Sequence, residues 1–211
     1  MRTTAAILIL IMSALTAASA DVQSPANLSS VGCQTQEVSL GDLMTDAVRT
    51  AAGTQIALIP AGGFREVTIS GGAVKTSDIL KCLQYPNDQI AVMRLTGDQL
   101  LKALQRSVSI YPQRNMGFLQ VSGLVLTFDP NAPKGSRIKS VTVGAEPVVP
   151  DHSYRVATTK PLADGAYGYF TIWGNAQPET KGKTIAQAAT DFLSQRTSVD
   201  YRVPNRILIN H

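Results

Sequence analysis

Apolar residues repeat with the spacing of a helix in residues 40–51. They recur at intervals of three and four, which places them on one face: Leu40, Leu43, Met44, Ala47, Val48 and Ala51. Ser39 precedes this face as the predicted N-cap, and Asp42 lies where the positive end of a helix favours an acid. Gly53 follows as the predicted stop. The pattern therefore predicts a helix that packs one side against a core.

Three later segments show helical spacing behind residues that cap helices. Thr76 is the predicted cap of a short helix that holds apolar residues at 79, 80 and 83. Thr96 with Gln99, and Thr184 with Gln187, form the Thr-x-x-Gln pattern of a capping box. Because apolar residues follow each box at intervals of three and four, we expect a helix after both.

Short apolar or alternating runs predict the strands. These runs lie at residues 56–59, 90–95, 118–121, 124–128, 138–143, 154–157 and 207–209. A turn is predicted at 60–63, directly after the first run. Since strands and helices are interleaved without repeats, the sequence predicts one α+β domain in which helices cover a mixed β-sheet.

The first 20 residues have the three parts of a secretory signal peptide. Arg2 gives a positive start, residues 5–15 are an almost continuous apolar run, and residues 18–20 (ASA) form a cleavage signal. The run is shorter than the about 20 residues that a membrane span needs. We therefore expect cleavage after Ala20, no membrane span, and a periplasmic or secreted protein.

Removing residues 1–20 leaves 191 residues, which are enough for one well-packed core. We interpret 21–32, which is polar and contains Pro25, as a flexible lead-in, and 33–211 as the domain. Loss of Arg2 lowers the formal net charge from +4 to +3. No window of five like charges occurs, so we do not expect nucleic acid as a partner.

The two cysteines, Cys33 and Cys82, leave two interpretations open. An even number of cysteines in an exported protein permits a disulfide, and closing this loop would stabilise the fold by about 4 kcal/mol. Two separate buried thiols fit the same residues. The residues alone do not decide between these alternatives.

Familiar catalytic motifs are absent from the sequence. Of its two histidines, His152 lies in a polar turn and His211 is the last residue, so we expect structural or solvent-exposed roles for both. A two-metal phosphoesterase site needs several His and Asp ligands. Zinc, redox, nucleophile-elbow and phosphate-loop patterns do not occur. We therefore predict no catalytic residue, no metal site and no cofactor.

The turn after the first predicted strand is the one local candidate for binding. Gly62 and Gly63 allow a ligand to approach the backbone closely, and Arg65 can bind an anion through two hydrogen bonds. Turns with two glycines are also common as plain connections between strands. This pattern alone does not distinguish a binding site from such a connection.

Motifs of one family occur in order along the predicted domain. Residues 40–47 (LGDLMTDA) are similar to LGNLxxDA, and 95–104 (LTGDQLLKAL) to LTGxQLLxAL. Further similarities are 60–65 (PAGGFR) to NGGGIR, 83–85 (LQY) to LPF, and 154–158 (YRVAT) to YRVAT. Over residues 33–170 the chain resembles the C-terminal domain of the 5'-nucleotidase family.

The resemblance implies a role in binding. In that family this domain grips the nucleoside by stacking its base between two aromatic rings, and a separate preceding domain holds the two metals. Here the predicted signal peptide leads almost directly into the C-terminal domain. We therefore expect a stand-alone module with a nucleoside or nucleotide ligand and with no catalysis of its own. A separate metallophosphoesterase chain is the expected protein partner.

The resemblance also assigns ligand-binding residues. Gly62, Gly63 and Arg65 are kept, and Tyr85 stands where the family has its first stacking Phe. The implied ligand set is completed by the aromatic residues of the segment 165–169 (GAYGY), Tyr167 and Tyr169.

Four positions depart from the family. Pro60 replaces the turn's Asn, Gln34 an Arg, Pro161 the second stacking Phe, and Tyr167 an Asp that contacts the ribose. The loss of one stacking partner and two charged contacts would remove roughly 4 to 9 kcal/mol of binding free energy. We therefore expect weak nucleotide binding unless another ring substitutes. The candidate rings are Phe64, Tyr167, Tyr169 and Trp173.

The resemblance further implies a Cys33–Cys82 disulfide, because both positions approach the same ligand site in the family.

Two other functions stay open beside the binding module. The first is a periplasmic interaction or scaffold protein that kept the fold and lost the site, which Pro60, Pro161 and Tyr167 favour. The second is a hydrolase acting in nucleotide breakdown, as the family label suggests.

Overall fold

A five-stranded sheet forms the centre of the molecule in a computed structural model that describes residues 21–174, 176–202 and 205–210. Its strand order is β12-β6-β11-β3-β7: Glu179–Thr184, Gln89–Thr96, Ser153–Thr159, Ile56–Pro60 and Leu119–Ser122. β3 and β11 run parallel, whereas the other neighbours are antiparallel. Every residue of β3 is buried, as an apolar strand inside a covered sheet requires. The predicted signal peptide lies outside the described residues.

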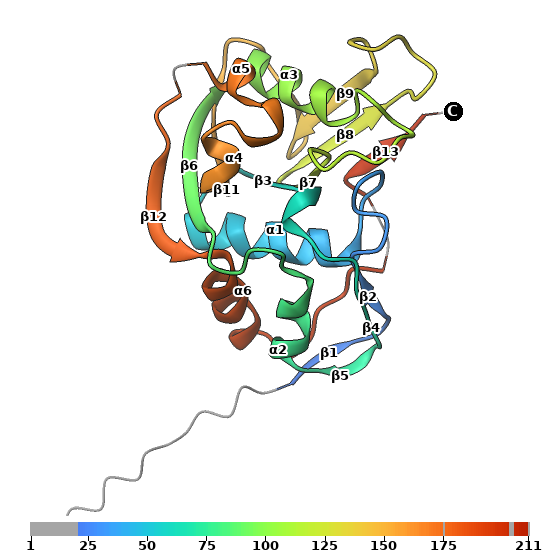
Figure 1. Ribbon diagram of the computed structural model, residues 1–211, viewed down its shortest axis with the longest axis vertical. Helices are drawn as coiled ribbons and strands as arrows, with labels where there is room; N and C mark the ends of the chain where they lie inside the picture. Colours follow the sequence, from blue (N-terminus) through green and yellow to red (C-terminus); the bar gives the residue numbers. More distant parts are fainter. Residues whose placement is uncertain (1–20, 175, 203–204, 211) are drawn as a thin grey trace, which may run out of the picture.

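A second sheet of four strands lies beside the first (Figure 1). Its order is β10-β9-β8-β13: Glu146–Pro147, Ile138–Val143, Leu124–Phe128 and Ile207–Ile209. The chain passes from β7 to β8 through Gly123, whose φ of 80° is the left-handed region that glycine adopts readily. A Cβ at this position would also overlap the carbonyl oxygen of Gln55. One glycine thus allows the change of sheet.

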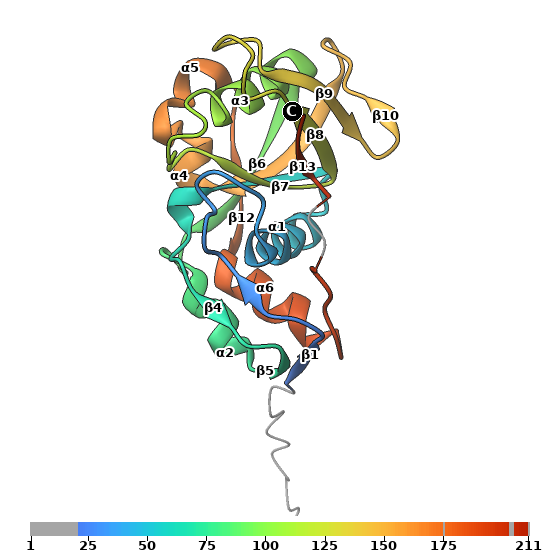
Figure 2. The ribbon, with the colours of Figure 1, turned by 90° about the vertical axis from the view of Figure 1, so that its right-hand side faces the viewer.

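Three longer helices cover the sheets. α1 (Ser39–Ala52) lies between the five-stranded sheet and α6 (Ile185–Ser194), while α3 (Gly97–Ser107) lies on the other side beside β6 and β9 (Figures 1 and 2). Both predicted capping boxes, at Thr96 and Thr184, are confirmed. Shorter helical turns are α2 (Thr76–Ile79), α4 (Lys160–Ala163), α5 (Phe170–Trp173), η1 (Ala61–Gly63), η2 (Leu80–Cys82) and η3 (Ala166–Gly168).

Helix α1 differs from the prediction at its first turn. Val38 is the N-cap, while Ser39 is already helical and its hydroxyl accepts a hydrogen bond from the Ser29 N–H at 2.7 Å. Lys75 likewise precedes α2, so Thr76 is the first residue of that helix and not its cap. Asp42 is buried, and this burial raises its pKa to about 8 despite its place near the positive helix end. Desolvation outweighs the helix dipole here.

The predicted flexible lead-in at 21–32 is wrong. This segment contributes β1 (Val22–Ser24), which pairs with β5 (Gly72–Val74), and β2 (Leu28–Ser29), which pairs with β4 (Thr68–Ile69). Val22 and Leu28 are fully or almost fully buried. The segment is therefore held by strand pairing, by backbone hydrogen bonds such as Ser30 N–H to the Val67 carbonyl at 3.0 Å, and by the burial of these two apolar residues.

The predicted α+β fold with mixed sheets and covering helices is confirmed. Its buried side chains form one continuous core that joins both sheets to α1, α3 and α6. Among the described residues, no helix has the length and apolar character that a membrane crossing would need. The turn after β3 lies at the edge of this core, where the candidate site is found.

Candidate functional site

The turn after β3 is held by the segment 115–118. The backbone N–H groups of Ala61 and Gly62 donate to the carbonyl oxygens of Phe118 at 2.7 Å and Met116 at 2.8 Å. Gly62 is buried, and a Cβ there would overlap the hydroxyl of Tyr167. The glycine is thus required by a side chain that arrives from another loop.

Arg65 lies beside the segment that carries Tyr85. Its backbone N–H donates to the Cys82 carbonyl at 2.7 Å, and its Nε donates to Gln84 Oε1 at 3.0 Å. Gln84 in turn donates its backbone N–H to the Gly63 carbonyl at 2.9 Å. Arg65 is exposed, and Tyr85 is 53% exposed. The fold therefore presents a guanidinium and an aromatic ring on neighbouring segments, with free surface on both.

Tyr167 lies over the turn in a strained conformation. Its φ of 57° is the positive value of a non-glycine residue, and Gly165 and Gly168 on either side also have positive φ. Arg106 holds the loop, because its Nε donates to the Tyr167 carbonyl at 2.9 Å and its Nη2 donates to the same oxygen. Burial, followed by the nearby Tyr85 and Asp88, raises the pKa of Tyr167. Such strain persists only where surrounding contacts enforce it.

Tyr169 is a core residue in this structure. It is fully buried, its hydroxyl donates to the Gly117 carbonyl at 2.7 Å, and its ring stacks on Trp173 with centroids 5.1 Å apart. Burial raises its pKa. Phe64 and Trp173 are also buried, so of the four rings considered as substitutes only Tyr167 reaches the surface of the turn. The structure thus gives Tyr169 no face toward a ligand.

An arginine that sequence reasoning missed lies beside Gln34. Arg114 donates from Nε to Gln34 Oε1 at 3.1 Å and from Nη2 to Glu66 Oε1 at 2.7 Å. Arg114 comes from the loop after α3 and brings a guanidinium, ion-paired with Glu66, next to position 34. No local motif signals this, because 80 residues separate Gln34 from Arg114. Pro161, which the resemblance aligns with the second stacking Phe, is exposed at the start of α4.

The predicted Cys33–Cys82 disulfide is wrong for this structure, in which both cysteines are free and buried. The Sγ of Cys33 donates to the Ala61 carbonyl oxygen, 3.8 Å away. Burial raises the pKa of Cys33 to about 11 and that of Cys82 to about 12, and the neighbouring Cys33 contributes to the second shift. The two thiols therefore lie near each other, and their raised pKa values disfavour the thiolate, which is the reactive form.

Metal-binding groups of three or more His, Cys, Asp or Glu side chains are not found in the part of the chain that the structure describes. The His152 ring packs edge-on against Tyr154, with centroids 5.0 Å apart, and His211 lies outside the described residues. The observed arrangement around the turn offers hydrogen-bond donors and aromatic surface.

Comparison with known proteins shows which family the chain matches. Residues 15–173 match the family described as 5'-nucleotidase, C-terminal domain. The trifunctional nucleotide phosphoesterase protein YfkN of Bacillus subtilis (strain 168) is 28% identical over 184 residues, which are 82% of this chain and 12% of that protein. An apyrase of Tabanus yao is 27% identical over 205 residues, covering 86% of this chain and 36% of the apyrase.

A solved structure of this family has the same fold. The crystal structure of a 5'-nucleotidase precursor from Thermus thermophilus superposes with a TM-score of 0.81 at 30% identity, over 90% of this chain and 39% of that chain. This chain thus spans less than two fifths of these relatives. Since the family match includes more than half of its residues, the chain belongs to the 5'-nucleotidase C-terminal domain family.

Proposed function

We propose that this domain binds a nucleoside, a nucleotide or another planar ligand at the turn of Gly62 and Gly63, without hydrolysing it alone. The observation that carries the proposal is the exposed pair of Arg65 and Tyr85, joined through Gln84. A guanidinium binds phosphate oxygens in pairs, and a phenol ring stacks on a base. Arg114 adds a second guanidinium on the neighbouring loop.

The proposal extends to a role in nucleotide breakdown outside the cytoplasm. The relatives are named as nucleotide phosphoesterases and apyrases, and the sequence begins with a predicted signal peptide. With two histidines in the whole sequence, a dimetal centre would have to come from elsewhere. We therefore include in the proposal a separate metallophosphoesterase chain as partner, and a periplasmic or secreted location.

Calorimetric titration tests the binding role. Adenosine, AMP and a UDP-sugar are titrated into the protein, its R65Q and Y85A variants, and R94Q as a matched control that removes an exposed arginine from β6. We expect saturable binding that weakens about tenfold in R65Q and Y85A and stays unchanged in R94Q, because each lost contact is worth about 1 to 3 kcal/mol. The absence of any binding at millimolar ligand would reject the proposal.

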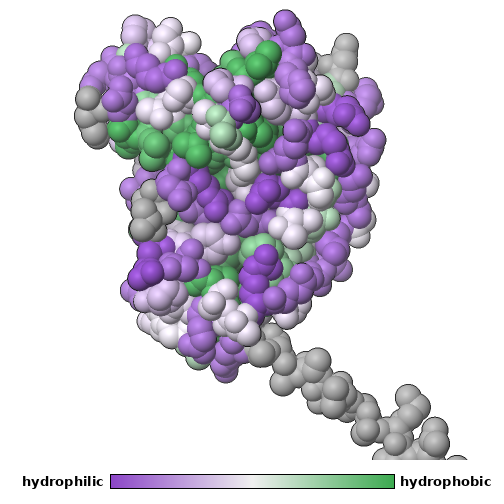
Figure 3. Space-filling view, turned by 180° about the vertical axis from the view of Figure 1, so that it is seen from behind, coloured by the Kyte–Doolittle hydropathy of each residue, from purple (hydrophilic) through white to green (hydrophobic). Residues whose placement is uncertain are grey.

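A scaffold role is the second candidate, and the contact of Tyr167 with Gly62 favours it. A side chain that already fills the turn leaves less room for a ligand. Hydrophobic residues also gather in the upper part of the back face (Figure 3), where they provide surface for a protein partner. Calorimetry that finds no ligand, together with a stable complex in cross-linking, would select this alternative.

A hydrolase is the third candidate, and the family alone supports it. Its test is release of phosphate from AMP by the purified chain with added divalent metal. Release that persists through purification and disappears with a chelator would overturn the proposal of a non-catalytic module.

A further inference from the structure

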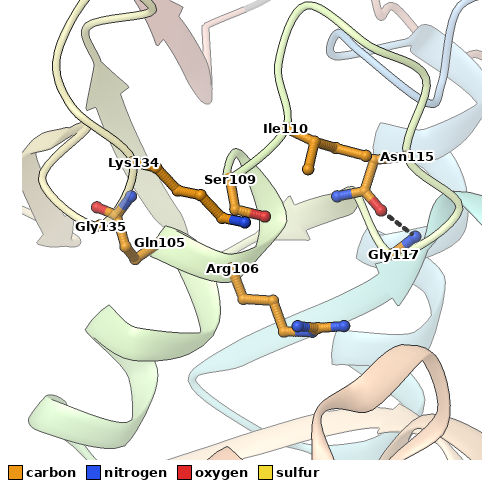
Figure 4. A pocket seen from close by; sticks show the side chains of 8 residues that line it. All are labelled: Gln105, Arg106, Ser109, Ile110, Asn115, Gly117, Lys134 and Gly135. Atoms are coloured by element: carbon orange, nitrogen blue, oxygen red, sulfur yellow. Dashed lines mark hydrogen bonds between the residues drawn. The ribbon is translucent and has the colours of Figure 1, made fainter.

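A cavity of about 290 Å³ lies between the end of α3 and the loops that follow α3 and β8. It is lined by Gln105, Arg106, Ser109, Ile110, Asn115, Gly117, Lys134 and Gly135. Figure 4 shows Gln105 and Lys134 on one side, Asn115 and Gly117 on the other, and Arg106 below. No acidic side chain is among these residues, so two cations face a cavity without a counter-charge.

Gln105 leaves a hydrogen-bond donor unused at this cavity. Its Oε1 accepts the backbone N–H of Ile138 at 3.0 Å, which fixes the orientation of the amide. Its Nε2 is buried and has no partner among the described residues. A buried donor without an acceptor is costly, and native proteins nearly always satisfy it. Gln105, which lines the cavity, thus carries one donor that no described group satisfies.

The two basic side chains are available for the same acceptor. Lys134 is exposed and makes no ion pair or hydrogen bond within the described chain. Arg106 spends Nε and Nη2 on the Tyr167 carbonyl, which leaves Nη1 without a partner among the described residues. In Figure 4 the Lys134 side chain reaches across the cavity toward Ser109, whose hydroxyl is a further donor.

The carboxyl end of α3 does not repel an anion here. Its carbonyl groups would give that end a negative potential. The Arg137 guanidinium, however, donates from Nη1 to the carbonyl oxygens of Val108 at 2.8 Å and Tyr111 at 2.7 Å. A third positive charge thus covers the helix end, and Asn115 Nδ2 donates to the Ser107 carbonyl at 2.7 Å.

We propose that this cavity binds the oxyanion group of a small molecule, a phosphate or a phosphate monoester, through Gln105 Nε2, Arg106 and Lys134. This site is separate from the glycine turn and does not depend on the function proposed above. Its volume exceeds that of one phosphate group, and the side chain of Ile110 gives it an apolar wall.

Titration by NMR tests the proposal with inorganic phosphate, AMP and adenosine as probes. We expect saturable shifts of the Gln105 side-chain amide and of the Gly117 and Gly135 backbone amides with phosphate and AMP, and none with adenosine. Shifts at these amides with AMP but not phosphate would assign the site to monoesters. Shifts with phosphate alone would assign it to the free ion.

Two variants and one control separate binding from folding. Gln105→Glu keeps the acceptor for Ile138 and replaces the donor by an oxygen, and Lys134→Gln removes a charge that supports no other contact. Both are expected to weaken phosphate binding at least about tenfold. Lys102→Gln removes an equal charge from the exposed face of α3, where it pairs with Asp98, and is expected to change nothing.

Three results would overturn the proposal. One is the lack of a saturable shift at Gln105 when phosphate is raised from a 100-fold excess over the protein to the solubility limit of the salt. Another is an equal loss in Lys102→Gln, which would reduce the effect to general attraction. The last is a phosphate response confined to Gly62, Gly63 and Arg65.

Discussion

At the scale of single residues, the contact between Gly62 and Tyr167 controls the candidate site. Gly62 has no positive φ, and the three atoms nearest to an added Cβ all belong to the hydroxyl and ring of Tyr167. We expect Gly62→Ala to destabilise the fold by about 1 to 3 kcal/mol, because the ring must move. The same change in a Tyr167→Gly background is expected to cost much less, as measured by urea unfolding.

Gly63→Ala is the matched control for this double-mutant cycle. A Cβ at Gly63 meets only Ile59, at an ordinary distance of 3.4 Å, so a small effect is expected. If Gly62→Ala costs the same with and without Tyr167, the ring does not occupy the turn.

Asp42 makes stability depend on pH. Burial raises the pKa of this carboxyl from 3.8 to about 8, with Arg206 opposing and Glu37 and Asp46 adding to the shift. The unfolded state therefore loses its proton first as pH rises, and the contribution of this group to stability falls between about pH 4 and pH 8. Because each pH unit in this range is worth about 1.4 kcal/mol, Asp42→Asn, which resembles the protonated acid, should gain on the original protein by up to about 4 kcal/mol from pH 5 to pH 8. Denaturant unfolding at both pH values measures this, and an unchanged difference would refute it.

At the turn, the sequence could predict which residues lie near one another only where a motif indicates it. The segments PAGGFR and LQY predict a site of Arg65, the two glycines and Tyr85, and the structure brings these segments together through Gln84. The motif could not predict which of Tyr167 and Tyr169 points into the core. The Tyr169 ring is buried because it contacts Gly117, which is distant in sequence, and Trp173, which is itself buried. Arg114 was missed for the same reason.

At the scale of elements, β13 is tied to the start of α1 by Glu37. Its carboxylate accepts the backbone N–H groups of Asn205 at 2.9 Å, Arg206 at 2.8 Å and Ile207 at 2.7 Å. The Arg206 guanidinium adds an ion pair to Asp46 at 2.9 Å. Hydrogen bonds to Arg206 and Ser122 lower the pKa of Asp46, although burial alone would raise it. The last strand is thus held by a carboxylate as well as by β8.

Glu37→Gln should loosen this strand. An amide presents one acceptor and one donor group to three backbone donors, so we expect a loss of about 2 kcal/mol and faster amide hydrogen exchange at 207–209. Glu146→Gln, on the exposed strand β10, is the control and should leave exchange unchanged. Equal exchange in both variants would show that β8 alone holds the strand.

Strands with alternating or continuous apolar residues were predictable from the sequence. The runs 124–128, 138–143 and 207–209 coincide with β8, β9 and β13. The sequence did not predict β1, β2 and β12. These strands are short or mostly polar, and they form only against partners distant in sequence. Their pairing is a tertiary effect that local propensity does not contain.

At the scale of the whole molecule, two donor-rich regions meet at the loop of Tyr167. The hydroxyl of Tyr167 lies on the glycine turn, while its carbonyl is held by Arg106, which also lines the phosphate-type cavity. Under the two proposals, the glycine turn takes a base with its phosphate, and the cavity takes an oxyanion. Both regions lie on one domain. Its described residues share a single hydrophobic core, and its fold matches that of a solved 5'-nucleotidase precursor.

Mapping AMP by NMR is the most direct test of binding at the glycine turn. The account predicts saturable shifts of the backbone amides of Gly63, Gln84 and Tyr85 with both AMP and adenosine, lost in Tyr85→Ala. Because phosphate alone should act at Gln105, the adenosine response isolates the turn. Saturable adenosine binding with shifts only elsewhere, or no response to adenosine at millimolar concentration, would contradict the account.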